Sequence, residues 1–256
     1  MRLLDLPQAK HFCSPPGPVR AATGRVSLPA FHHGLPTHVV VMAEGTTPFQ
    51  IQQVNVIDSV ERWLAFALAN FRRSVEMLVP ISAPWAHVTL YYSSFFSANA
   101  ILGMFGGWIG HTEKGIRAVD VESASLGTQS LRVHRRLKAP SGATGSHRVF
   151  WDVFYHSTAT IAAWAPASLA SALSPVNGDY AWQIAERNCV NYDMLHAWVA
   201  STAFHTSLRP AKLNSLSGPL QLQLETTQTL LQLALHLRRH SVRANDRDGV
   251  SAGFVR

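Results

Sequence analysis

The residues best suited to chemistry lie in one short segment, where Arg187 is followed by Asn191 and His196. Cleavage of RNA by attack of a 2′-hydroxyl needs a cation beside the phosphate and a group that moves protons near neutral pH. Arginine can hold a phosphate with two donors, and histidine can act as general acid or base. Arg187, Asn191 and His196 are therefore the candidate catalytic residues. On one continuous helix, Arg187 and Asn191 share a face while His196 lies about 180° around the axis, so a break or a second copy of the chain must bring His196 to Arg187.

A second group of residues suited to phosphate contact lies in the Gly-, Pro- and Ser-containing stretch 132–148. Arginine binds phosphate through a planar fork of donors, and clustered cations are typical of nucleic-acid surfaces. We interpret this stretch as a loop that binds RNA, and the alternative is a solvated basic loop. The candidate RNA-binding residues are Arg132, His134, Arg135, Arg136, Lys138 and Arg148.

The overall charge permits an anionic partner. The 256 residues carry 22 Lys and Arg against 15 Asp and Glu, a formal charge of +7, and 18 of the 22 basic residues are Arg. The bland alternative is a compositional preference for Arg. Charged residues are only 14% of the chain, which excludes a disordered polyelectrolyte and favours a partner protein or homo-oligomer that covers apolar surface.

The sequence predicts no metal site and no cofactor. His11, Cys13, His32 and His33 match no zinc spacing, and the glycine-rich loops that bind nucleotides are absent. Two cysteines are too few for a disulfide framework, so we expect a reducing, cytoplasmic compartment.

Two stretches without Asp, Glu, Lys or Arg, 77–112 and 153–178, raise the question of a membrane span. Prolines interrupt both, and neither has a flanking excess of Lys and Arg. We expect buried helices and no membrane, with a small membrane-associated protein as the weakest alternative.

Apolar periodicity predicts a mainly α fold, a bundle of about five helices preceded by an irregular N-terminal segment with short strands. Helices are expected from Asp58 to about 80, from 84 or 85 to between 103 and 106, over 148–164, from Asp179 through 188 and as far as about 203, and from Pro219. Strands are expected at 37–43 and, more weakly, at 25–31. The pattern over 107–146 is ambiguous, and its glycines suggest a loop after the second helix. The tail from Ser241 is polar. We predict an arm or small β subdomain over 1–55, a helical bundle over 56–240 and a flexible tail over 241–256.

Two segments in combination resemble a known family. The aromatic helix AHVTLYYSSFFSANAILGMFG (86–106) and the later ERNCVNYDM (186–194) are similar to segments of the HEPN superfamily of helical nucleotide-binding domains. The resemblance covers roughly 58–240. It implies a helical bundle that commonly dimerises, with aromatic residues Tyr91, Tyr92, Phe95 and Phe96 in the core or an interface.

The resemblance implies one of two functions. Many members are metal-independent ribonucleases of defence, toxin–antitoxin and CRISPR systems that leave a 2′,3′-cyclic phosphate, and others are inactive scaffolds. The active pattern is Arg, four to six residues, then His. Arg187 matches the Arg, but positions 192–194 hold Tyr192, Asp193 and Met194. We therefore predict an RNA-binding protein of a prokaryotic defence or toxin-type system with an endoribonuclease site at Arg187, and the alternative is an inactive scaffold that mediates protein–protein assembly.

Overall fold

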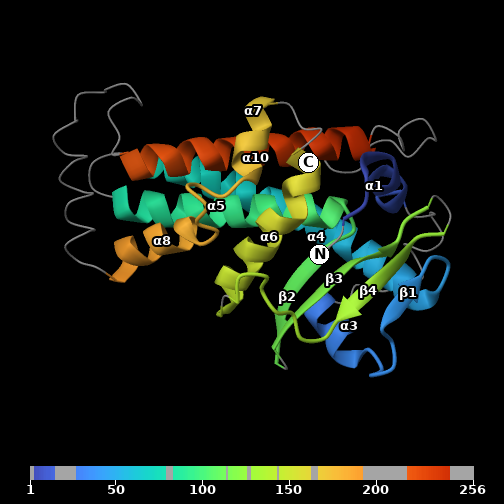
Figure 1. The fold of residues 1–256 in the computed structure, drawn as a ribbon. Coiled ribbons are helices and arrows are strands. Elements are labelled where there is room, and N and C mark those ends of the chain that lie inside the picture. Colours follow the sequence, from blue (N-terminus) through green and yellow to red (C-terminus); the bar gives the residue numbers. More distant parts are fainter. Residues whose placement is uncertain are drawn as a thin grey trace. The chain divides into compact units, whose positions relative to one another are not determined.

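The computed structural model describes residues 3–14, 27–78, 83–113, 115–125, 128–142, 144–162, 167–192 and 218–242 (Figure 1). The chain divides into two compact units, each built from separate stretches of sequence. The first unit comprises Met1–Glu61, Asn99–Lys138 and Ala234–Arg256. The second unit comprises Arg62–Ala98 and Ala139–Leu233.

The fold is mainly α with one small antiparallel sheet. The helices are α1 (Leu6–Phe12), α3 (Leu28–Gly34), α4 (Thr47–Met77), α5 (Ala83–Met104), α6 (Ser146–Ala162), α7 (Ala167–Ala170), the 3-10 turn η1 (Ser171–Leu173), α8 (Trp182–Tyr192) and α10 (Gly218–Val242). The strands are β1 (Val41–Ala43), β2 (Trp108–Thr112), β3 (Gly115–Ser123) and β4 (Ser130–His134). The mainly α prediction is confirmed, although the described residues form more helices than the five predicted.

The sheet belongs to the first unit and has the order β1-β4-β3-β2, with every neighbouring pair antiparallel. The register pairs Trp108 with Val119 and Val119 with Val133, so these side chains share one face of the sheet. All three are at most 5% exposed. This face supplies the apolar core of the unit.

The opposite face carries two diagonal ion pairs between β3 and β4. His134 Nε2 lies 2.8 Å from Asp120 Oδ1, and Arg132 donates to both carboxylate oxygens of Glu122. Cross-strand opposite charges of this kind stabilise a strand pair modestly. They link β3 to β4 on the face opposite Trp108, Val119 and Val133.

The glycines of 107–146 suggest a loop after the second helix. The structure instead forms β2, β3 and β4 in this stretch. β3 shows no alternation of polar and apolar residues, because both of its faces are covered and even Arg117 and Asp120 are buried. The proposed basic loop 132–148 is also wrong at both ends, since it begins on β4 and finishes inside α6.

Two positions require glycine, one in the turn after α5 and one inside β2. Gly106 follows α5 with φ +77°, and a Cβ there would lie 3.1 Å from Leu4 Cδ1. Only glycine adopts that conformation freely. A Cβ on Gly110 would lie 2.1 Å from the Trp108 ring, so the missing side chain lets Trp108 lie flat along its own strand.

The N-terminal segment differs from the prediction of strands. Residues 28–31, expected within a weak strand over 25–31, lie in α3. Ser27 caps this helix by accepting from Ala30 N, and Pro29 occupies its first turn, where the lost N–H is harmless. The strand expected over 37–43 forms only as β1, at its last three residues.

α4 begins at Thr47, well before the predicted start at Asp58. The added turns place polar side chains inside, because Gln52, Gln53 and Asn55 are all at most 6% exposed. Gln53 Nε2, for example, donates to the Phe12 carbonyl at 2.7 Å. Buried amides satisfied by tertiary contacts break the apolar periodicity from which a helix is predicted.

The remaining helix predictions agree with the structure to within a few residues. α5, α6 and α10 start within two residues of their predicted starts, and α8 starts three residues after Asp179. Asp179 instead accepts a hydrogen bond from Ala181 N at 2.7 Å just before that helix. The predicted continuation from 193 to 203 lies outside the described residues.

None of the helices formed by the described residues combines the length and apolarity that a bilayer crossing requires.

His32 on α3 is the most strongly perturbed histidine of the first unit. It is 0% exposed, stacks on Trp108 with centroids 4.3 Å apart, and its Nε2 lies 2.9 Å from Gln52 Oε1. Burial first, and then the charges of Arg117 and Arg135, lower its pKa from 6.5 to about 4. The folded protein therefore keeps this ring neutral where the unfolded chain protonates it.

We predict that His32 makes the protein less stable in mild acid. Between pH 6.5 and 4 the unfolded chain binds a proton at this site that the folded chain does not, so the free energy of unfolding falls by about 3 kcal/mol as the pH falls. Urea unfolding from pH 7 to 4 measures this slope. His32→Gln should flatten it, and His33→Gln, at the exposed neighbour, should leave it unchanged. Equal slopes in all three proteins would contradict the assignment.

Candidate functional site

Buried polar side chains hold α8 in place within the second unit. Gln223 Nε2 on α10 donates to Gln183 Oε1 on α8 at 3.0 Å, and Gln183 Nε2 donates to Tyr155 Oη on α6 at 3.1 Å. Gln223 also reaches Ser94 Oγ on α5 at 3.2 Å. Four helices thus meet through one chain of hydrogen bonds, and α5 and α10 run side by side around it (Figure 1).

Arg187 follows Gln183 by one turn of α8 and therefore shares its face. Its guanidinium carbon lies 5.1 Å from the centroid of the Tyr91 ring on α5, a cation–π contact. Arg187 is half-buried, and its Nε has no hydrogen-bond partner among the described residues. No described carboxylate forms an ion pair with it, so its charge remains available for an anion.

The hydroxyl of Tyr91 joins Arg187 to a histidine that sequence spacing does not select. Tyr91 Oη lies 2.6 Å from His147 Nδ1, and Trp151 Nε1 donates to the same oxygen at 3.4 Å. His147 and Trp151 lie in the first turns of α6, whereas Tyr91 comes from α5. The ring of His147 also packs against Phe95, with centroids 4.8 Å apart. Three helices thus place His147 and Arg187 around one tyrosine.

The electrostatics give each group a defined protonation state. Burial raises the pKa of Tyr91 far above its ordinary value, so the hydroxyl stays protonated and donates to His147 Nδ1. Burial first, and then the charge of Arg187, lower the pKa of His147. His147 is therefore neutral at neutral pH, with its single N–H proton on Nε2. Arg187 and Nε2 of His147 are hydrogen-bond donors suited to phosphate oxygens.

The start of α6 adds further positive potential. Ser146, His147 and Arg148 form its first turn, where unpaired backbone N–H groups and the helix dipole favour an anion. Arg148 is exposed and has no ion-pair partner among the described residues. The predicted RNA-binding role of Arg148 is therefore compatible with its position beside His147.

Of the two other predicted catalytic residues, the structure describes Asn191 but not His196. Asn191 lies one turn further along α8 and is exposed. His196 lies outside the described residues. The structure instead brings His147, a residue of the predicted basic stretch, to Tyr91, which Arg187 also contacts. The Arg-to-His spacing pointed to a histidine further along the helix of Arg187. No short-range motif could have found His147, because only the packing of α5, α6 and α8 brings it to Arg187.

The predicted RNA-binding residues of the first unit have different surroundings. Arg132 and His134 are engaged with Glu122 and Asp120 on the sheet. Arg135 donates to the carbonyls of Pro36 and Val39. These three residues have structural partners that sequence alone did not indicate.

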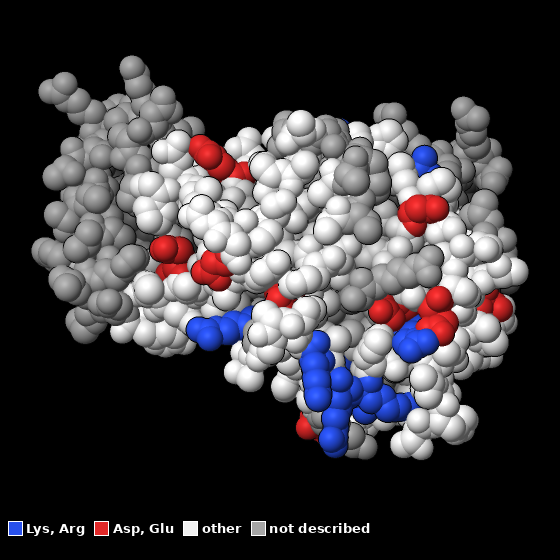
Figure 2. All heavy atoms as spheres, in the orientation of Figure 1, with Lys and Arg blue, Asp and Glu red and all other residues white. Residues whose placement is uncertain are grey.

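Arg136 and Lys138 remain exposed, without an ion pair to any described carboxylate. Figure 2 shows Lys and Arg side chains gathered at the bottom of the view, where Figure 1 places the sheet of the first unit and α3. These two residues are the part of the predicted basic stretch in this unit that is open to an anionic partner.

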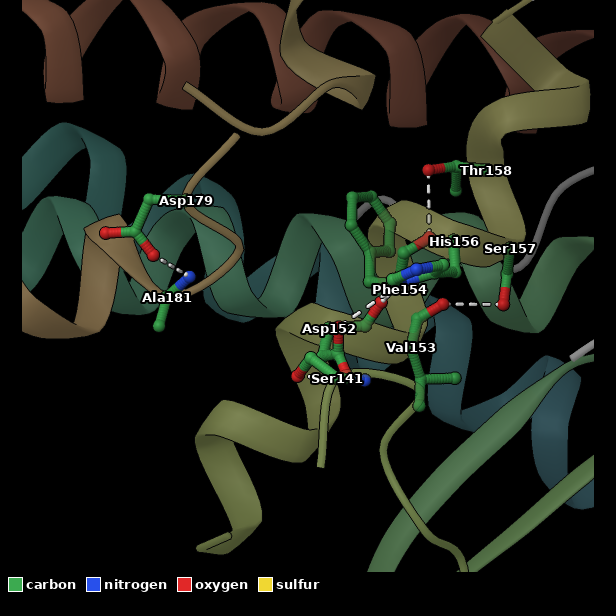
Figure 3. Close-up of polar contacts among 9 residues, drawn as sticks. All are labelled: Ser141, Asp152, Val153, Phe154, His156, Ser157, Thr158, Asp179 and Ala181. Atoms are coloured by element: carbon green, nitrogen blue, oxygen red, sulfur yellow. Dashed lines mark hydrogen bonds and ion pairs between the residues drawn. The ribbon is translucent and has the colours of Figure 1, made fainter. Parts of the chain in front are cut away.

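A second cluster in the second unit holds Ser, His and Asp side chains but lacks the geometry of a catalytic triad. Asp152 Oδ2 accepts from both N and Oγ of Ser141, each at 2.9 Å (Figure 3). His156 Nδ1 contacts the same residue, 2.7 Å from the Asp152 carbonyl oxygen and 3.3 Å from Oδ1. A triad needs the histidine between serine and carboxylate. Here the carboxylate lies between them, and it anchors the segment before α6 to that helix.

Throughout the described ranges, no group of three or more His, Cys, Asp or Glu side chains lies close enough together to hold a metal ion.

Comparison of the chain with protein-family models, curated proteins and solved structures gave no match.

We predict that the Tyr91 hydroxyl stabilises this cluster. Tyr91→Phe keeps the ring beneath Arg187 but leaves His147 Nδ1 and Trp151 Nε1 without their partner. An unpaired buried polar group costs about 1–3 kcal/mol, and urea unfolding should show a loss of that size.

Tyr92→Phe is the matched control for this substitution. Tyr92 is half-buried on the same helix, and no hydrogen bond joins its hydroxyl to a described residue. Its loss should change the free energy of unfolding by less than about 0.5 kcal/mol. Equal effects of the two substitutions would show that the Tyr91 hydroxyl does not organise the cluster.

Proposed function

We propose that the protein binds RNA at the cluster of Arg187, His147 and Tyr91 and cleaves it without a metal ion. The observation that carries this proposal is Arg187, which pairs with no carboxylate among the described residues and lies over Tyr91 next to a neutral histidine. Together these groups supply a phosphate-binding cation and a proton-transfer group. The resemblance to the HEPN superfamily supports the same chemistry and suggests a prokaryotic defence or toxin-type system.

The proposed reaction is transesterification within the RNA. The 2′-oxygen attacks phosphorus and loses its proton to water, while the bond from phosphorus to the 5′-oxygen breaks. Arg187 donates hydrogen bonds to the non-bridging oxygens and stabilises the charge that develops on them. His147 Nε2 gives its proton to the departing 5′-oxygen while Nδ1 takes the proton of the Tyr91 hydroxyl, so the ring stays neutral. Both shifts reverse when Nε2 takes a proton from water. The products are a 2′,3′-cyclic phosphate and a 5′-hydroxyl.

Positioning in this mechanism comes from Tyr91 and the start of α6. The hydrogen bond from Tyr91 to Nδ1 fixes the tautomer of His147, so the single N–H proton of the neutral ring lies on Nε2. Arg148 and the first turn of α6 attract the RNA backbone electrostatically. His147 takes the proton-transfer role that the sequence suggested for His196.

An assay with purified protein, total RNA and excess EDTA tests the proposal. Wild type should cleave RNA and leave 2′,3′-cyclic phosphate ends. Arg187→Ala and His147→Gln should each slow cleavage by about 100-fold or more, as expected for loss of a charge-stabilising or proton-transfer group.

Arg72→Ala is the matched control, because it removes an arginine of the same unit that is 85% exposed and paired with Glu76. It should cleave like wild type. Cleavage by Arg187→Ala at the wild-type rate, or absence of cleavage by folded wild type, would contradict the proposed activity.

A specific observation favours a second function, that of a scaffold subunit. Phe66, Leu68 and Val75 on α4 and Trp85 on α5 are between 44% and 64% exposed. Exposed apolar side chains mark protein–protein interaction surfaces when they cluster, and Phe66 packs 5.4 Å from Phe96. An inactive scaffold would assemble with itself or a partner protein. In the RNA assay it would neither bind nor cleave RNA, and Arg187→Ala would behave as wild type.

A further inference from the structure

Two arginines of the sheet lie next to each other without a negative group between them. β3 pairs Ala118 with His134, the last residue of β4, so Arg117 and Arg135 are the residues that adjoin this pair at the end of the two strands. Like charges placed opposite each other on neighbouring strands destabilise a sheet. Arg117 is only 3% exposed, and burial together with the charge of Arg135 lowers its pKa. The pair therefore lacks a counter-charge among the described residues.

Backbone carbonyls hold each guanidinium at one nitrogen and leave another nitrogen open. Arg117 Nη1 donates to the carbonyl of His32, and Arg135 Nη2 donates to the carbonyls of Pro36 and Val39. The Nε atoms of both arginines are buried and have no hydrogen-bond partner among the described residues. Carbonyls orient the two cations but neutralise no charge, so two oriented donors remain for a ligand.

The neighbouring carboxylates of the sheet are already engaged. Asp120 pairs with His134, and Glu122 pairs with Arg132. The next residues along the chain, Arg136 and Lys138, are exposed cations that raise the positive potential further. The two carboxylates of β3 are therefore engaged with other side chains.

His32 lies beside these arginines, and its carbonyl accepts from Arg117. It is fully buried, it stacks on Trp108, and its Nδ1 has no hydrogen-bond partner among the described residues. The charges of Arg117 and Arg135 both reach this ring and contribute to its lowered pKa. A negative ligand beside the arginines would offset their charge and raise the pKa of His32.

We propose that Arg117 and Arg135 form a binding site for a phosphate group at the end of the sheet. A phosphate oxygen can accept from guanidinium nitrogens that no carbonyl occupies, and two cations match the charge of a phosphate dianion. The group comes either from free inorganic phosphate or from the backbone of RNA. The site consists of residues of the first unit alone, so it does not rest on the activity proposed for Arg187.

Thermal unfolding of the full chain in inorganic phosphate tests this site. About 10 mM phosphate at pH 7 should raise Tm by a few degrees relative to chloride of equal ionic strength, because a ligand that binds only the folded state stabilises it. In the same titration, the NMR signal of His32, assigned with His32→Gln, should show a raised pKa. Absence of both changes in wild type would overturn the proposal.

Arg135→Gln removes one guanidinium group and should abolish the phosphate-specific rise in Tm. Arg132→Gln is the matched control on β4, the strand that Arg135 follows, since Arg132 pairs with Glu122, and it should keep the rise. Arg135→Lys, which keeps the charge without the fork, replaces the first variant if that one does not fold. An equal rise in the Arg135 and Arg132 variants would overturn the assignment to Arg135.

A short RNA oligomer added to the phosphate-bound protein identifies the source of the group. If RNA displaces phosphate, the His32 signal moves from its phosphate-bound value to its RNA-bound value. This result supports an RNA phosphate as the ligand. Phosphate that stays bound in the presence of RNA supports free inorganic phosphate. If neither inorganic phosphate nor the RNA oligomer binds, the proposed phosphate site is overturned.

Discussion

The arrangement of the second unit depends on one buried chain of amide hydrogen bonds. Gln223 is 0% exposed and Gln183 is 1% exposed, and the two link α10, α8 and α6 through Tyr155. Burial raises the pKa of Tyr155 to about 12, so its hydroxyl remains a neutral hydrogen-bonding partner. An amide that lost its partner here would cost about 1–3 kcal/mol, which opposes sliding of α8 along its neighbours. The chain of hydrogen bonds therefore fixes where the next turn of α8 lies.

That next turn carries Arg187, and its position gives the site its chemistry. Gln183 sets the register, the Tyr91 ring supports the guanidinium, and the Tyr91 hydroxyl orients His147. The sequence identified Arg187 as the cation, but it directed the search for a histidine along the same helix. His147 comes instead from α6, because proximity in a bundle is decided by helix packing. Spacing rules detect partners only when both lie on one element.

The fold was predictable where apolar periodicity follows burial. α5 and α6 have apolar residues in helical register and were located within a few residues of their ends. The prediction failed where polar side chains are buried. Gln52 and Asn55 hid the first turns of α4, and Arg117 and Asp120 removed the alternation expected of β3. Three of these buried side chains contact residues distant in the sequence. Gln52 contacts His32, Arg117 donates to the His32 carbonyl, and Asp120 contacts His134. A local pattern contains no information about such contacts.

The central claim is that Arg187 and His147 share one phosphate site, and the pKa of His147 measured by NMR tests it most directly. In wild type, a dinucleotide with a 2′-O-methyl group, which cannot be cleaved, should raise this pKa because its phosphate offsets the charge of Arg187. Without ligand, Arg187→Gln should raise it as well, and Arg72→Gln should not. A His147 pKa that responds neither to the dinucleotide nor to loss of Arg187 would contradict the account.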